Sequence, residues 1–502
     1  MLTKYLILAL YFLVLLLIGF ISSKQVKDLK DYYVGGKKLG YWVVAFSTRA
    51  TGESAWLLLG LTGLGAMVGV SAFWVVLGEI IGVSVAWFVL AKRFKWLTDK
   101  YDSITIPDYL VSRFKSKTHT LRLIAALSLA IFVIIYVSAQ IDATGSAFEA
   151  FLGWNYYGGA LFGFVIVLAY IFFGGFVAVA WSDLFQGILM FLGLVLLPIF
   201  ALFNMTTGPS ILDGLHTIDP NLVNIWGGNL NILTIATIAG YVLIGLGFMG
   251  SPQIFVRFMS IRDEEEINKG RWVALFYTLL SDAAAVTIGV FGRYLFTEAG
   301  ADPEIVLGNN GQNVLIQMVE STFPLIIVGF YIAVVLSAIM STIDSLLVVA
   351  SSAVMRDIYQ QIFNPHAKVE NLTSLSRIVT LGMALLALAI AMTVAFTTPD
   401  RTIFWFVIFG WSGIAATFCP VIVLSLFWQK YSEQGAIASM IVGFLSVPFF
   451  KFVVTRIDTI GPVFDRLDVL GPSFLLSMLA GVIVSMIKPG FNQDVAELNS
   501  RD

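Results

Sequence analysis

The chain has 502 residues, of which 58% are hydrophobic and 12% are charged, and its formal net charge is −2 at pH 7. Soluble domains carry about 25% charged residues, so this composition is typical of a polytopic membrane protein. The near-neutral charge excludes a strongly basic nucleic-acid-binding protein, and the single cysteine excludes an internal disulfide.

Apolar segments of about 20 residues, the length of a membrane-spanning helix, recur along the whole chain. We treat residues 1–502 as one membrane domain and expect the first helix to stay uncleaved, because no small-residue cleavage site follows it. Thirteen spans are predicted near residues 5–22, 41–69, 71–92, 120–148, 157–178, 183–204, 231–256, 271–297, 323–350, 374–397, 402–428, 434–453 and 469–487.

Basic residues predict the orientation of these spans. Lys and Arg cluster after the first, third, seventh and ninth spans, and the cluster after the seventh begins with Arg257. Residues 205–230 and 298–322 contain neither Lys nor Arg. This alternation predicts a multi-pass protein of the cytoplasmic membrane, with its N-terminus outside and its C-terminus inside.

The second span is interrupted by the polar stretch Phe46-Ser-Thr-Arg-Ala-Thr-Gly-Glu-Ser-Ala-Trp56. A charged residue at the centre of a lipid-facing helix costs about 2.5–3.5 kcal/mol on insertion scales. Unwound backbone is tolerated at this depth where it is buried in protein or lines a wet cavity. We therefore predict a broken helix that forms a polar site. The alternative is that Arg49 and Glu53, four residues apart, neutralise each other on a continuous helix.

A second interruption, Ile244-Gly-Leu-Gly-Phe-Met-Gly-Ser-Pro252, lies in the seventh span. Spans 2–6 and 7–11 would then be two five-helix repeats of opposite orientation, residues 41–204 and 231–428. The helices 5–22, 434–453 and 469–487 lie outside these repeats. Broken helices at matching places in two halves indicate a transporter site. Alternatively, the glycines serve close helix packing.

The ninth span carries Ala338, Ser341, Thr342 and Ser345 on one helical face. Hydroxyl oxygens beside the free carbonyls of an unwound helix suit a dehydrated sodium ion. Such a face is also typical of interhelical hydrogen bonding.

Three more carboxylates, those of Glu79, Asp142 and Asp282, fall within predicted spans. Intramembrane ionisable residues mark ion or substrate paths. They favour either a cationic or amine-bearing substrate or the participation of a proton.

Several motifs resemble the sodium/solute symporter family, specifically its sodium/proline symporter branch, over about residues 5–487. They are Tyr32-Tyr-Val-Gly-Gly-Lys-Lys-Leu-Gly40, Ile106-Pro-Asp-Tyr109, Phe172-Phe-Gly-Gly-Phe-Val-Ala-Val-Ala-Trp-Ser-Asp183 and Gly435-Ala-Ile-Ala-Ser-Met-Ile-Val-Gly443, together with the glycines of the second break. The resemblance implies an all-helical leucine-transporter-type inverted-repeat fold and sodium-coupled solute uptake by alternating access.

The resemblance also implies two ion sites. The common sodium site would use three backbone oxygens and two hydroxyls, those of Ala50, Glu53, Ala338, Ser341 and Thr342. A second cation or proton site would use Asp183, Asp344 and Ser345, where Asp344 departs from the serine of the family. The residues alone also allow Asp183 to cap the predicted sixth span.

The substrate is expected between the two breaks, at Ser54, Trp56, Tyr136, Gln140, Ile244, Phe248, Pro252 and Trp411. Gly52 stands where the proline branch has aspartate, and Ile244 and Phe248 stand where it has tryptophan and tyrosine. Proline is therefore one candidate among several amino acids.

Function is expected to be sodium-coupled import of a small organic solute, an amino acid or related amine. The expected partners are this solute, sodium ions and the lipid bilayer. No nucleophile–base or metal constellation indicates an enzyme. One alternative is a proton-coupled symporter that uses Glu53, Asp183 or Asp344. Another is a solute-sensing membrane receptor.

Overall fold

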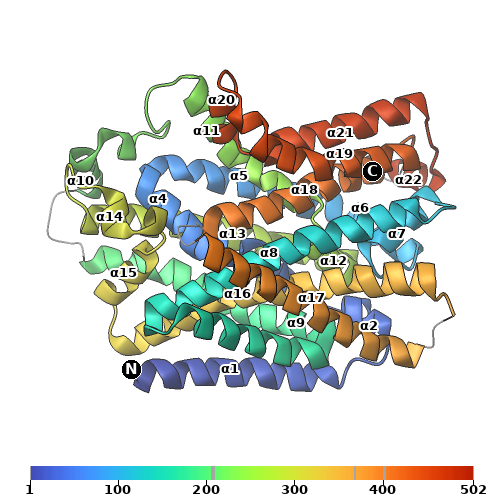
Figure 1. The fold of residues 1–502 in the computed structure, drawn as a ribbon, viewed down its shortest axis with the longest axis horizontal. Coiled ribbons are helices and arrows are strands. Elements are labelled where there is room, and N and C mark those ends of the chain that lie inside the picture. The colour runs from blue at the N-terminus through green and yellow to red at the C-terminus, as the bar shows by residue number, and fades with distance from the viewer. Residues whose placement is uncertain (1, 205–209, 367–368, 399–402, 501–502) are drawn as a thin grey trace.

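The computed structural model describes residues 2–204, 210–366, 369–398 and 403–500 (Figure 1). The regular elements within these residues are all helices, apart from one isolated parallel bridge between Leu39 and Ile261. Eleven described helices are long and apolar enough to cross a membrane. The predicted class, an all-helical polytopic membrane protein, is confirmed. The predicted start of a span at residue 402 lies outside the described residues.

The long helices outside the two breaks are α1 (Leu2–Ser23), α8 (Thr120–Leu152), α9 (Tyr156–Asn204), α13 (Glu264–Phe296), α16 (Leu325–Ser352), α17 (Val369–Thr397), α18 (Ile403–Phe427), α19 (Glu433–Phe452) and α21 (Leu470–Ile487). Short elements connect them: α2 (Leu29–Val34), η1 (Gly35–Lys37), η4 (Val85–Leu90), α6 (Ala91–Lys100), α7 (Ile106–Phe114), α10 (Ile211–Ile218), η5 (Pro220–Val223), α14 (Pro303–Leu307), η7 (Asn309–Gly311), α15 (Val314–Thr322), η8 (Ala353–Phe363), η9 (Val454–Arg456), α20 (Gly461–Leu467) and α22 (Gln493–Asn499).

The first predicted break is present in α3 (Tyr41–Ala55), where Ser54 has φ +53° and ψ −167°. A positive φ in a residue other than glycine costs about 1–3 kcal/mol and persists where the surroundings impose it. The chain continues through η2 (Trp56–Leu61) and α4 (Thr62–Val68). It then turns at Gly69 (φ +65°) into η3 (Gly69–Ala72) and α5 (Phe73–Ser84).

The second predicted break is also present. Helix α11 (Ile232–Leu243) passes into the 3-10 segment η6 (Ile244–Met249), and α12 starts at Pro252 and runs to Ser260. Proline suits this first position because its fixed φ is helical and it lacks an N–H. These glycines also serve close helix packing, which was the alternative explanation for them. A Cβ on Gly245 would lie 1.9 Å from the carbonyl oxygen of Gly78, so α5 and η6 touch backbone to backbone.

The predicted spans 157–178 and 183–204 both fall within α9, a helical run of 49 residues that is kinked at Gly175, where φ is +52°. At this kink the apolar helix Tyr156–Phe172 is followed by the candidate span Gly174–Phe203. A Cβ at Gly175 would lie 2.5 Å from the ring of Tyr32. Asp183 therefore lies inside a helix, and its interpretation as a helix cap is wrong.

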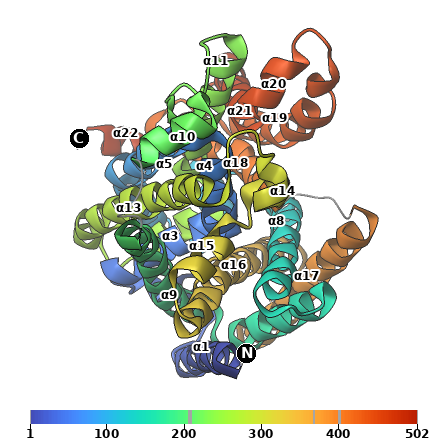
Figure 2. The ribbon, with the colours of Figure 1, turned by 90° about the vertical axis from the view of Figure 1, so that its left-hand side faces the viewer.

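Helix α16 is buried at every residue from Tyr331 to its end at Ser352. It packs against α3, α8 and α9, and α3 also packs against α13. Figures 1 and 2 place α1 on one side of the molecule and α19 and α21 on the opposite side. The broken helix α3 therefore lies in the interior, where its polar groups need protein partners.

Candidate functional site

The first break meets α16 at a set of buried oxygen atoms. Ser341 Oγ donates to the carbonyl oxygens of Ala50 (3.0 Å) and Ala338 (3.2 Å). Thr342 Oγ1 donates to the carbonyl oxygens of Ala338 (3.1 Å) and Thr51 (3.3 Å). Four of the five residues predicted for the sodium site thus contribute oxygen atoms to one place.

The break in α3 changes the hydrogen-bond partners around the carbonyl of Thr51. In a regular helix the carbonyl of Thr51 would accept from the N–H of Ala55. Here that N–H donates to Gln140 Oε1 at 3.2 Å. The carbonyl of Glu53, the fifth predicted ligand, accepts from the N–H of Trp56 instead. Thr51 was missed by the sequence analysis, because a backbone oxygen carries no signal in the residue type.

The residues predicted for the second ion site are also brought together. Ser345 Oγ donates to Asp344 Oδ1 (3.1 Å), and Tyr170 donates to Asp344 Oδ2 (2.8 Å). Ser47 Oγ donates to Asp183 Oδ2 at 2.6 Å. All five of these residues are buried, with Tyr170 at 1% exposure and the other four at 0%.

Arg257 lies between these acidic residues. Its Nη2 contacts Asp183 Oδ2 at 2.8 Å and also donates to Ser345. The sequence analysis counted Arg257 among the basic residues of a cytoplasmic loop, which is wrong, because it is fully buried in α12. The signal that was available is one arginine in an otherwise uncharged segment, Pro252–Ser260. It supplies a permanent positive charge to Asp183.

A small cavity of about 10 Å³ lies beside the first break. Five residues predicted for the substrate line it: Trp56, Tyr136, Ile244, Phe248 and Trp411. The others that line it are Gly52, Glu79, Val407 and Ile408. Among the remaining predicted residues, Gln140 hydrogen-bonds the break, and Ser54 and Pro252 do not line the cavity.

Gly52 is required by this cavity wall. A Cβ there would lie 2.8 Å from Phe248 Cε1, and the ring of Phe248 packs against Trp411 with centroids 5.1 Å apart. A larger side chain at Gly52, such as the aspartate that the resemblance implies for the proline branch, would require the ring of Phe248 to shift.

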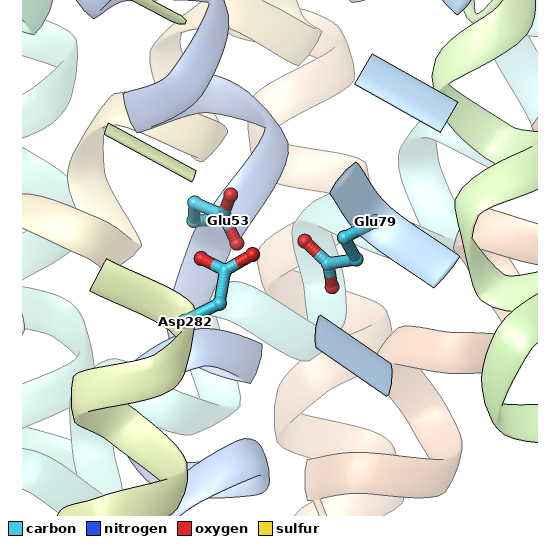
Figure 3. Close-up of side chains that lie close together, drawn as sticks. All are labelled: Glu53, Glu79 and Asp282. Carbon is cyan, nitrogen blue, oxygen red and sulfur yellow. The ribbon is translucent and has the colours of Figure 1, made fainter. Parts of the chain in front are cut away.

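Four charged side chains converge at the edge of this cavity: Arg49 and Glu53 from α3, Glu79 from α5 and Asp282 from α13 (Figure 3 shows the three acids). Arg49 Nη2 forms ion pairs with Glu53, with Glu79 Oε2 (3.5 Å) and with Asp282 Oδ2 (3.8 Å). Each of the four is at most 1% exposed. The predicted pairing of Arg49 with Glu53 is present, but two further carboxylates share the same guanidinium.

Other contacts orient this cluster. The indole N–H of Trp56 donates to Glu79 Oε1 at 3.3 Å, and Ser281 Oγ donates to Asp282 Oδ1 at 2.9 Å. The guanidinium of Arg49 lies 4.9 Å from the ring centroid of Phe248. Asp142, the third carboxylate noted in the spans, instead accepts a 2.5 Å hydrogen bond from Tyr156.

The comparisons with known proteins agree on one family. The sequence profile described as "Sodium:solute symporter family" matches residues 32–443. The chain is 35% identical over 487 residues to the high-affinity proline transporter PutP of Bacillus subtilis (strain 168), covering 96% of this chain and 98% of that protein. It is 33% identical over 442 residues to the sodium/proline symporter of Escherichia coli (strain K12), covering 88% and 86%.

Two solved structures are similar in fold. A Na+-coupled sialic acid symporter in a substrate-bound outward-open state has a TM-score of 0.80 at 20% identity, and the match covers 97% of each chain. Mhp1, a nucleobase-cation-symport-1 family transporter in a closed conformation, has a TM-score of 0.55 at 11% identity, covering 93% of this chain and 97% of that one. At these identities the matches show that the fold is shared.

Proposed function

The chain belongs to the sodium:solute symporter family, and we propose that it uses a sodium gradient to import an amino acid or related amine. It is a sodium-coupled solute symporter and not an enzyme. Proline is a candidate solute because relatives at 33–35% identity are proline transporters. The different cavity residues Ile244 and Phe248 leave other amino acids as candidates too.

The meeting of the first break with α16 carries this proposal. We propose that sodium binds the backbone oxygens of Ala50, Glu53 and Ala338 and the hydroxyls of Ser341 and Thr342. The buried hydrogen bonds from Ser341 and Thr342 to carbonyls of α3 support it. A bound ion would replace these bonds and tie α3 to α16. A ligand shifts a conformational equilibrium only by its differential affinity for the two states, so this site must be complete in one state of the cycle.

We propose that the residues of the second predicted ion site have two different roles. Arg257 neutralises Asp183, and Asp344 with Ser345 takes a proton or a further cation. The hydroxyl donors around Asp344 and the ion pair of Arg257 with Asp183 support this division.

We further propose thirteen spans, with inverted repeats 41–204 and 231–428, in one domain of the cytoplasmic membrane, with the N-terminus outside. The 60-residue run Tyr41–Lys100 has a turn at Gly69, and the apolar helix Tyr156–Phe172 precedes the kink of α9. The run Tyr41–Lys100 is one of the eleven candidates and is counted here as two spans. The helix Tyr156–Phe172 is counted as one more, which gives thirteen spans. Rocking of one helix bundle against the other would give alternating access.

The test is uptake of labelled amino acids and amines into proteoliposomes under separate inward gradients of sodium and protons. Ser341→Ala and Thr342→Ala should each raise the sodium concentration for half-maximal uptake. Ser351→Ala is the matched control, because Ser351 is buried on the same helix but donates to Val348 within α16. Equal sodium dependence in all three variants would refute the sodium site. Accumulation driven by protons alone would assign coupling to the carboxylates, and binding without transport would favour a receptor.

A further inference from the structure

We propose that the transported solute carries a net charge of +1, as a basic amino acid or a monoamine does, and that its charged amino group binds the carboxylate cluster formed by Glu53, Glu79 and Asp282 (Figure 3). This inference rests on the proposed function, because it assumes that the cavity beside the first break is the solute site.

Charge balance is the first argument. The ligand oxygens of the three carboxylates lie within 4.8 Å of one another, and the one basic side chain that pairs with them in the described chain is Arg49. With all three carboxylates ionised, the four groups carry two net negative charges in a fully buried place. Buried charge that is not neutralised is expensive, since desolvation costs several kcal/mol per ion. A sodium ion at the adjacent break would supply one positive charge, and a solute of charge +1 would supply the second.

Unused bonding capacity is the second argument. Apart from its ion pair with Arg49, neither carboxylate oxygen of Glu53 accepts a hydrogen bond from the described residues. Asp282 Oδ2 likewise accepts none, although it lies 3.8 Å from Arg49 Nη2. Buried carboxylate oxygens normally have donors, and an unsatisfied one costs about 1–3 kcal/mol or more when it is charged. An ammonium group, which has up to three N–H donors and no acceptor, would satisfy such a set of oxygens.

Access from the cavity is the third argument. Glu79 lines the cavity together with the aromatic side chains of Trp56, Phe248 and Trp411. A carboxylate beside aromatic faces is a favourable environment for an organic cation, because the ring quadrupole attracts positive charge. The indole N–H of Trp411 has no hydrogen-bond partner among the described residues, although Trp411 is 96% buried. This donor is available for the carboxylate of a bound amino acid.

A zwitterion such as proline fits this cluster less well, because its net charge is zero and the site would remain negative by one charge with sodium bound. A proton on one carboxylate would correct that imbalance. The two cases differ in what crosses the membrane, so they can be separated experimentally.

The experiment measures sodium-driven uptake of labelled lysine, ornithine, proline and glycine betaine into proteoliposomes. Binding of labelled lysine and proline to the purified protein in sodium is measured in parallel. We expect half-saturation for lysine or ornithine at concentrations about tenfold to a hundredfold lower than for proline, the factor that a hydrogen bond to a charged group supplies. Glu79→Gln removes one charge with little change of shape and should shift the preference toward the zwitterions.

Asp142→Asn is the matched control, because Asp142 is a buried carboxylate that bonds Tyr156 and does not line the cavity. It should keep the preference for basic solutes. A purely structural role for Glu79 would lower uptake of every solute without changing the order of preference, and would overturn the inference.

The other outcomes are distinct. Sodium-driven uptake of proline with lysine and ornithine excluded would overturn this inference and leave the proposed function intact. Uptake of proline with a co-transported proton would assign the missing charge to that proton and also overturn it. Lysine binding in the absence of any transport would support the solute class while refuting the symporter proposal, and absence of lysine binding would refute the solute class.

Discussion

The buried pair of Arg257 and Asp183 allows a quantitative test of how α12 is held against α9. Arg257→Met removes the guanidinium but keeps much of the apolar stem. Asp183, at 0% exposure, would then lose its one charged partner at 2.8 Å. Removing one member of a buried ion pair costs about 3–5 kcal/mol, because the other charge stays buried and unpaired.

Removing both charges should be much less costly. Arg257→Met/Asp183→Asn removes both members of the pair, and replacing a whole buried pair with uncharged groups is often close to neutral. We therefore expect the double variant to be more stable than the single variant Arg257→Met. The measurement is the free energy of unfolding in mixed detergent micelles for the wild type, both single variants and the double variant.

Lys269→Met provides the control, because Lys269 and its partner Glu265 are both exposed. It should change stability little. If the double variant were as unstable as the sum of the two single variants, Arg257 and Asp183 would not be coupled, and the assignment of Arg257 as the counter-ion would be refuted.

Two further predictions concern close approaches of glycines. Gly52→Ala would place a Cβ 2.8 Å from the ring of Phe248, so we expect weaker solute binding with little change in the sodium concentration for half-maximal uptake; an unchanged solute affinity would mean that Phe248 moves freely. Gly245→Ala would place a Cβ 1.9 Å from the backbone oxygen of Gly78, which cannot rotate away. Overpacking costs about 1–3 kcal/mol or more, so thermal unfolding in detergent should show clear destabilisation, and a wild-type melting temperature would contradict the packing of α5 on η6.

Local features of the chain were predictable because their cause is local. Polar residues or glycines inside an apolar segment make a continuous lipid-facing helix unfavourable, and both predicted breaks, at Ser54 and at Ile244–Met249, are present. The interpretation of Asp183 as a helix cap failed because the position of the kink depends on a contact that is distant in the sequence. The chain kinks at Gly175, where Tyr32 packs against the glycine, and no pattern in the segment itself reveals that contact.

The membrane class, the approximate spans, the two breaks and the residue types around them could be predicted from the sequence, since hydropathy and backbone preference act over a few neighbouring residues. Which charged side chains meet depends on how the helices pack. Glu79 and Asp282 were visible as carboxylates inside spans, but their convergence on Arg49 depends on the packing of α3, α5 and α13. Arg257 resembled a loop residue because it follows an apolar segment, whereas α12 carries it into the interior. Apart from the pair of Arg49 and Glu53, which are four residues apart, these ion pairs join residues that are distant in the chain, so they follow from helix packing and not from spacing.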